Sequence, residues 1–204
     1  MARYLMTHSL LSSWLYAMKS NPFEDITTEK DPWEEFLRVL RREPTETTEA
    51  MRNGIEFEAL VTDIAAGADA DTDHKWYSAA AIAARKVKGG VVQYKAKMDI
   101  EISGIHVLLY GRIDFLKAGV VIDTKFSKSY ERGKYIDSTQ HPVYLRLIPE
   151  AESFMYLVSN GTDVWTEVYR RDETMDIEPV IADFFRDMEE KGLMHLYKEH
   201  WVAL

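Results

Sequence analysis

The spacing of apolar positions along the chain changes at about residue 90. Before that point apolar residues recur at helical spacing, which predicts helices over 9–19, 31–42, 48–66 and 78–88. After it the apolar positions alternate, which predicts strands over 91–102, 105–117 and 120–126. A helix around 138–147 comes next, followed by a second strand pair over 154–158 and 164–169 and a last helix over 178–191. Beyond it we expect a polar and aromatic tail.

This order of elements indicates one α/β domain over residues 1–204, because no internal repeat or long linker interrupts it. We expect a mixed central β-sheet flanked by helices on both faces. Residues 1–90 would form a helical N-terminal part, 91–170 the sheet-bearing core and 177–204 the C-terminal helix.

One predicted hairpin carries an unusual arrangement of charge. The dipeptide 118–119 reads as a tight turn between two apolar strands. In that register Asp114 lies directly opposite Asp123, with β-carbons about 5 Å apart, and Arg112 lies opposite Lys125. Alternation places Asp114, Asp123 and Lys125 on one face. Two facing carboxylates destabilise a strand pair unless a divalent cation binds between them.

Composition narrows the function classes. The chain of 204 residues is 46% hydrophobic, which is enough to bury a core as one domain. It contains no cysteine, which excludes disulfides, thiolate zinc sites and cysteine-ligated iron–sulfur clusters. Its sequence has no apolar run of membrane-spanning length, and its first eight residues do not resemble a secretory signal. We therefore expect a cytoplasmic protein without a membrane partner.

The net charge of −9 is unevenly distributed. Residues 85–134 contain eleven Lys and Arg but five Asp and Glu, a net +6, and the remainder of the chain carries −15. A basic segment around a carboxylate pair suits a polyanion bound through a metal ion. An ordinary solvated charged surface is an equally good interpretation of the charge alone.

The hairpin supplies the groups that phosphodiester hydrolysis needs. Carboxylates bind Mg²⁺ or Mn²⁺, the metal polarises the phosphate and activates water, and a lysine stabilises the developing charge. Asp114, Asp123 and Lys125 provide this set, and the main-chain carbonyl of Thr124 could add a neutral oxygen ligand.

These residues resemble a known family. Asp114 followed by Asp123-Thr124-Lys125 is similar to the signature of the PD-(D/E)XK nuclease superfamily. Gln140 and Tyr144 resemble the Gln-X-X-X-Tyr motif of its RecB-like branch, which includes phage exonucleases. Residues 54–58 resemble the Gly-X-X-X-His/Glu helix of that branch, and residues 7–10 resemble its opening serine-containing helix.

The resemblance implies a restriction-endonuclease-like fold and a metal-dependent DNA nuclease, an exonuclease of recombination or repair. In that family the last residue of the Gly-X-X-X-His/Glu motif contributes to the metal site. The implied metal-site residues are Glu58, Asp114, Asp123 and Thr124. Lys125 would orient or activate water, and Gln140 and Tyr144 would support substrate binding. Some relatives carry an iron–sulfur cluster, but this chain has no cysteine and cannot be of that type.

The expected partner is DNA. Lys128, Arg132 and Lys134 follow the motif directly and are candidates for contacts with backbone phosphates. A single-strand annealing or other recombination protein is a candidate partner, as is a second copy of the chain.

Alternative interpretations stay open for individual residues. Asp114 could be a strand residue paired with Arg112 or Lys125. Gln140 and Tyr144 are four residues apart on one helical face, where they could pack against each other. Glu56 and Asp63 share a predicted helix with Glu58, and either could take its role.

Two other function classes also stay open. The chain could be a non-catalytic nucleic-acid-binding module that keeps the nuclease fold. It could also be an unrelated α/β interaction protein whose hairpin acids are salt-bridged.

Overall fold

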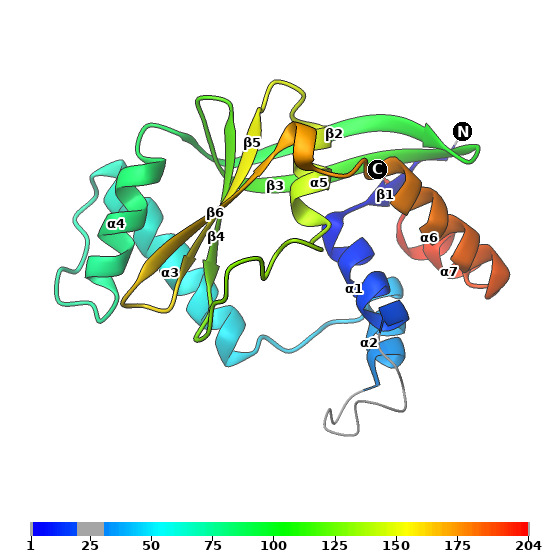
Figure 1. The fold of residues 1–204 in the computed structure, drawn as a ribbon. Coiled ribbons are helices and arrows are strands. Elements are labelled where there is room, and N and C mark those ends of the chain that lie inside the picture. Colours follow the sequence, from blue (N-terminus) through cyan, green and yellow to red (C-terminus); the bar gives the residue numbers. More distant parts are fainter. Residues whose placement is uncertain (1, 20–30, 204) are drawn as a thin grey trace.

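Six strands form one mixed sheet in the computed structural model, which describes residues 2–19 and 31–203 (Figure 1). The strands are β1 (Tyr4–Met6), β2 (Val91–Ile102), β3 (Ile105–Lys117), β4 (Val120–Phe126), β5 (Ser153–Ser159) and β6 (Val164–Arg170). Their order is β1-β3-β4-β5-β6, and β2 also pairs with β3. β1 is parallel to β3 and β4 to β5, while the other pairs are antiparallel. The predicted α/β fold with a mixed central sheet is confirmed.

Helices cover both faces of this sheet (Figure 1). They are α1 (His8–Lys19), α2 (Pro32–Leu40), α3 (Glu49–Ala66), α4 (Tyr77–Val87), α5 (Gln140–Leu147), α6 (Glu178–Glu190) and α7 (Met194–His200), with a 3₁₀ turn at Arg171–Glu173. Helices α3 and α4 form one buried cluster with β4 and β5, and α1, α2, α5, α6 and α7 form a second, larger cluster on the other face. No helix in the described part of the chain is long and apolar enough to cross a membrane.

Capping residues define the ends of α2 and α3. The Asp31 side chain accepts a hydrogen bond from the Trp33 N–H at 2.9 Å, ahead of the proline that opens α2. The Thr48 side chain accepts one from the Met51 N–H at 3.2 Å at the start of α3. Gly67 ends α3 with φ +76°, a left-handed conformation that glycine adopts without strain.

Two elements differ from the prediction. The N-terminal part is not wholly helical, because β1 pairs with β3, and the predicted polar and aromatic tail contains the helix α7. Both elements depend on long-range contacts between the chain ends. The Leu5 N–H donates to the Trp201 carbonyl at 2.6 Å, and the Ala203 N–H donates to the Arg3 carbonyl at 2.8 Å. A three-residue strand is too short to show an alternating pattern of its own.

Strand β3 changes face at Asp114. Ile113 lies in the cluster under α5, whereas Phe115, two residues later, lies in the cluster under α3 and α4. Residues two apart in a regular strand point to the same face, so the backbone is irregular between them. The β2–β3 ladder pairs Val92 with Phe115 and Tyr94 with Ile113, but it has no pair at the intervening position. This irregularity positions the candidate site.

Candidate active site

The candidate site lies where two strands leave the same edge of β3. Because β2 occupies one edge of β3 from 105 to 116, β1 and β4 must both lie on the other edge. β1 pairs with 107–109 and β4 with 115–117, which leaves 110–114 without a strand neighbour on that edge. A cavity of about 380 Å³ opens at this gap.

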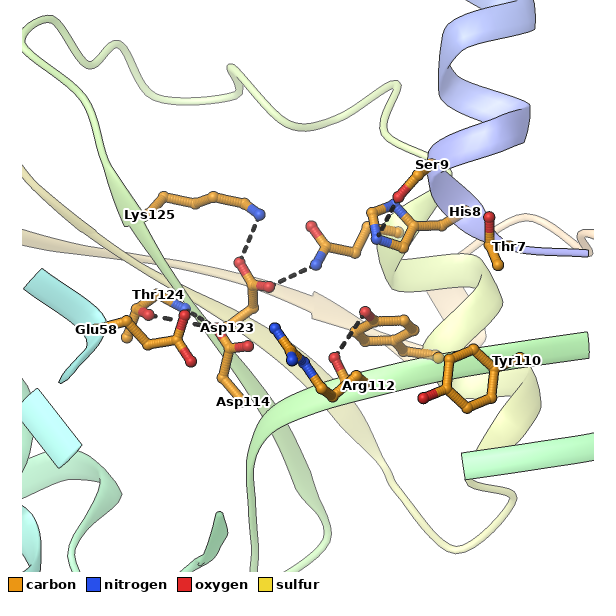
Figure 2. Close-up of a pocket in the computed structure, with 13 residues that line it drawn as sticks. Thr7, His8, Ser9, Glu58, Tyr110, Arg112, Asp114, Asp123, Thr124 and Lys125 are labelled. Atoms are coloured by element: carbon orange, nitrogen blue, oxygen red, sulfur yellow. Dashed lines mark hydrogen bonds and ion pairs between the residues drawn. The ribbon is translucent and has the colours of Figure 1, made fainter. Parts of the chain in front are cut away.

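Residues from five separate segments line the cavity (Figure 2). They are Thr7, His8, Ser9, Glu58, Tyr110, Gly111, Arg112, Asp114, Asp123, Thr124, Lys125, Gln140 and Tyr144. The fold therefore brings together the residues that the resemblance singled out as metal, catalytic and motif residues. Lys128, Arg132 and Lys134, the predicted phosphate contacts, lie outside this cavity.

The register of the hairpin is confirmed near the turn and wrong at the acids. Lys117 pairs with Val120, as predicted, but the β3–β4 ladder ends at the pair Phe115–Ile122. Asp114 is therefore not a ladder partner of Asp123. β4 pairs with β5 along its whole length but with β3 only over its first three residues. Beyond them the Asp114 carboxylate accepts the Thr124 N–H at 3.0 Å. The Asp114 carboxylate thus accepts an N–H of β4 that a main-chain carbonyl would accept if the β3–β4 ladder continued.

The predicted pairing of Arg112 with Lys125 is also wrong. Arg112 lies opposite Lys95 of β2, and Lys125 lies alongside Val158 of β5. The exposed Arg112 side chain nevertheless lines the cavity, and its charge lowers the pKa of Glu58, against the larger effect of burial. The site therefore contains a guanidinium that was not among the predicted site residues.

Asp123 is the most enclosed acid of the site. Its side chain is 6% exposed, Oδ1 accepts a hydrogen bond from Gln140 Nε2, and Lys125 Nζ lies 2.8 Å from Oδ2 (Figure 2). Oδ2 is completely buried and forms no hydrogen bond of good geometry with any described residue, so the lysine is its only close partner among them. A buried carboxylate oxygen with one cation has unused capacity for ligation.

Glu58 reaches the cavity from α3 with the help of a residue that sequence reasoning missed. Its carboxylate accepts a hydrogen bond from Gln93 Nε2. Gln93 stands at the β2 position facing Asp114, where the ladder is interrupted, and its φ is +53°. A left-handed non-glycine residue within a strand is strained. One glutamine between two apolar strand residues shows no sequence signal that could have revealed this contact.

The acids of the site raise one another's pKa. Burial and the neighbouring Asp123 and Glu58 raise the pKa of Asp114 to about 8. Burial, and then Asp123, also raises the pKa of Glu58. The carboxylates are thus close enough to repel, which favours either protonation or a bound cation.

Gln140 and Tyr144 do more than pack against each other. Gln140 holds Asp123, and the Tyr144 hydroxyl donates to the Arg112 carbonyl at 2.9 Å, on the unpaired edge of β3. A Cβ added at Gly111 would lie 2.5 Å from the Tyr144 ring, so this close approach requires glycine. The two motif residues therefore fix α5 against both carboxylate-bearing strands.

The first turn of α1 forms another wall of the cavity. Thr7 Oγ1 accepts the Leu10 N–H at 3.3 Å, and the His8 ring packs edge-on against Tyr144 at 5.4 Å. Burial, and then the charge of Lys125, lowers the pKa of His8 to about 4, so its imidazole is neutral at pH 7. The resemblance relates this segment to the family's opening helix, and it assigns no role to His8.

The predicted phosphate-contact residues lie on the loop between β4 and α5. Arg132 and Lys134 line a separate hollow of about 380 Å³. The Lys134 ammonium donates to Ser127 Oγ at 2.8 Å and to the Ser129 carbonyl at 3.0 Å, so it helps to shape its own loop. Lys128 is exposed.

Metal binding stays a prediction. Within residues 2–19 and 31–203, no three His, Cys, Asp or Glu side chains are placed so that they could hold a metal ion as they stand. Gln93 holds Glu58, and Lys125 holds Asp123.

Comparison with known proteins defines the fold and nothing finer. No family model matches the chain, and no curated protein matches it. A solved structure described as "Crystal structure of SSO0001" is similar, with a TM-score of 0.55 and 14% identity, over 92% of this chain and 76% of that chain. At this identity the likeness shows a shared fold. It does not extend to activity.

Proposed function

We propose that this protein is a Mg²⁺- or Mn²⁺-dependent deoxyribonuclease of the PD-(D/E)XK type, RecB-like branch. The observation that carries the proposal is the meeting of three acids and a lysine in one cavity. Each comes from the position that the family motif assigns to it, although Glu58 lies 56 residues before Asp114 in the sequence. A chance motif in the sequence would not be expected to converge in space.

The donor set fits a hard divalent cation. Carboxylate oxygens are the preferred ligands of Mg²⁺ and Mn²⁺, and Asp123 Oδ2 is buried without a hydrogen bond from the described residues. Glu58, Asp114 and Asp123 would hold the ion, and the carbonyl of Thr124 stays a candidate ligand. A bound metal would polarise the phosphate and lower the pKa of water.

The protein's own residues would then orient the substrate and the attacking water. Gln140 fixes one oxygen of Asp123, which leaves the other, Oδ2, to face Lys125. Lys125, whose ammonium lies 2.8 Å from that oxygen, would orient the attacking water and stabilise charge on the phosphate. Arg112 and the loop residues Lys128, Arg132 and Lys134 would contact phosphates of the DNA backbone.

A cleavage assay with end-labelled linear and closed circular DNA tests this function. In Mg²⁺ or Mn²⁺ we expect linear DNA to be degraded and closed circles to survive, and EDTA should stop the reaction. Asp123→Asn and Lys125→Ala should each reduce cleavage by about 100-fold or more. Asp63→Asn changes an exposed acid on α3 and should leave the rate unchanged. Undiminished cleavage by Asp123→Asn, or cleavage in EDTA, would refute the proposal.

A non-catalytic DNA-binding module is the second candidate. The observation that favours it is the Lys125–Asp123 ion pair, which already neutralises the acid that a metal would need. Binding of DNA in EDTA, without cleavage in any divalent metal, would support this candidate over the nuclease.

A further inference from the structure

Strand β2 forms a long open edge of the sheet. It has 12 residues and pairs with β3 along one side. Within the described part of the chain, its other side has neither a strand partner nor a main-chain hydrogen bond from a loop. An open edge of this length is a template for another strand, and proteins usually block such edges.

Along this strand two basic side chains are followed by two acidic ones. Lys95, Lys97, Asp99 and Glu101 alternate with apolar residues and are all exposed on one face. The intervening residues, from Ala96 to Ile102, pack on the core under α5 and α6. Two bases are thus followed by two acids on a single exposed row.

We propose that two copies of the chain associate through their β2 edges, antiparallel, about a two-fold axis at Met98. In this register Lys97 faces the partner copy's acid at position 99, and Lys95 faces the acid at position 101. Each pair occurs twice by symmetry, and opposite charges directly across an antiparallel pair are stabilising. The two sheets would become one continuous sheet.

The charges select this register over its neighbours. An axis at residue 97 would place Lys97 against its own copy, and an axis at residue 99 would do the same with Asp99. An axis at residue 96 would oppose Lys95 to Lys97, and one at residue 100 would oppose Asp99 to Glu101. Axes at 97 and 99 also form two attractive pairs each, Lys95 with the acid at 99 or Lys97 with the acid at 101. The pattern is therefore purely repulsive with the axis at 96 or 100, mixed at 97 or 99, and free of like-charge pairs only at 98.

The surroundings of these four charged side chains also suit a second copy of the chain. Asp99 and Glu101 line an open hollow of about 700 Å³, in which Arg3 holds Asp99 at 2.9 Å. The hollow leaves room for the partner's lysine side chains. Lys95 faces Arg112 across the β2–β3 ladder, a like-charge contact that the partner's acid at position 101 would offset.

Charge-reversal variants test the interface without reference to catalysis. We expect the wild-type chain to be a dimer in sedimentation equilibrium at low salt and about 100 µM. Lys95→Glu/Lys97→Glu and Asp99→Lys/Glu101→Lys should each be monomeric. An equimolar mixture of the two variants should form a dimer again, because the acidic edge of one then faces the basic edge of the other. Arg85→Glu/Lys88→Glu, on exposed positions at the end of α4, gives the same charge change as the lysine variant and should stay dimeric.

A wild-type chain that is monomeric at this concentration would overturn the proposal, whether or not the protein cleaves DNA. Failure of the mixture to associate would also overturn it. So would a dimer that both edge variants retain. If only the lysine variant loses DNA binding and both variants keep the wild-type mass, the row serves a polynucleotide and not a second copy.

Discussion

Two buried acidic groups of this protein have opposite surroundings. Glu167 of β6 is 8% exposed and is surrounded by donors. Its carboxylate accepts from the Tyr130 hydroxyl at 2.6 Å, from the Gly133 N–H at 3.2 Å, and from the Tyr169 hydroxyl. Burial opposes its ionisation, but these hydrogen bonds outweigh burial and lower its pKa.

The cavity acids face other acids instead. Asp114 accepts the Thr124 N–H and, at 3.3 Å, the Thr124 hydroxyl, but burial, Asp123 and Glu58 together raise its pKa. A carboxylate whose oxygens all accept hydrogen bonds from the protein needs no further partner, and its role is to stabilise the fold. A carboxylate opposed by its neighbours keeps a capacity for a cation, so the contrast separates a structural acid from the acids of the candidate site.

Changing Glu167 should cause a large loss of stability. Glu167→Gln turns an amide toward donors that need an acceptor, so we expect unfolding free energy to fall by about 3 kcal/mol. The loop from β4 to α5 should also loosen, because Glu167 holds its Tyr130 and Gly133. Urea unfolding measures the first effect, and faster tryptic cleavage after Arg132 measures the second. Unchanged stability would mean that the hydrogen bonds to Glu167 do not stabilise the fold.

Metal should stabilise the protein through the cavity acids alone. Mn²⁺ at 100 times its dissociation constant should add about 2.7 kcal/mol, seen as a higher melting temperature. Asp123→Asn should abolish this increase, while Glu167→Gln, although less stable, should retain it. Equal stabilisation of both variants would place the ion elsewhere.

The pH dependence of the metal-free protein gives a third test. The pKa of Asp114 is raised to about 8, so the folded state binds a proton that the unfolded chain releases near its ordinary value of 3.8. Stability should therefore fall as pH rises toward 8, by at most about 1.4 kcal/mol per pH unit for one group. His8, with its pKa lowered from 6.5 to about 4, opposes this trend only below pH 6.5. Thermal unfolding in EDTA between pH 6.5 and 8, where His8 no longer opposes the trend, should show the fall, and Asp114→Asn should reduce it.

The smallest effects should come from Gln93→Gly, which should raise the stability of the fold but lower the affinity for Mn²⁺. Gln93→Gly relieves the strain of a φ of +53° and should stabilise the fold by up to about 1 kcal/mol. It also removes the amide that positions Glu58, so Mn²⁺ affinity should fall several-fold in calorimetric titration. A glycine variant that gains stability without losing affinity would show that Gln93 does not position the metal site.

The sequence predicted the parts of this molecule that local rules control. Five of the six strands and the turn at Ala118 follow from alternation and turn chemistry. The sequence also predicted that Glu58, Asp114 and Asp123 share one site, and all three line the same cavity.

The features that the sequence did not predict depend on where one strand stops pairing with its neighbour. Strict alternation placed Asp114 opposite Asp123, but β4 leaves β3 before those residues pair. The change of face at Asp114 and the contact between Gln93 and Glu58 both follow from that irregular backbone. β1 could not be predicted, because its partner strand lies about a hundred residues away.

The meeting of the chain ends at β1 has a topological consequence. Arg3 bonds to Ala203 and Leu5 to Trp201, so the first and last described residues lie side by side beside the strand that leads into the cavity wall. A short peptide joining the ends would convert the chain into a closed ring without moving any strand. Such a backbone-cyclised form should unfold at a higher temperature, because closure removes conformations available to the unfolded chain and leaves the native sheet as it is.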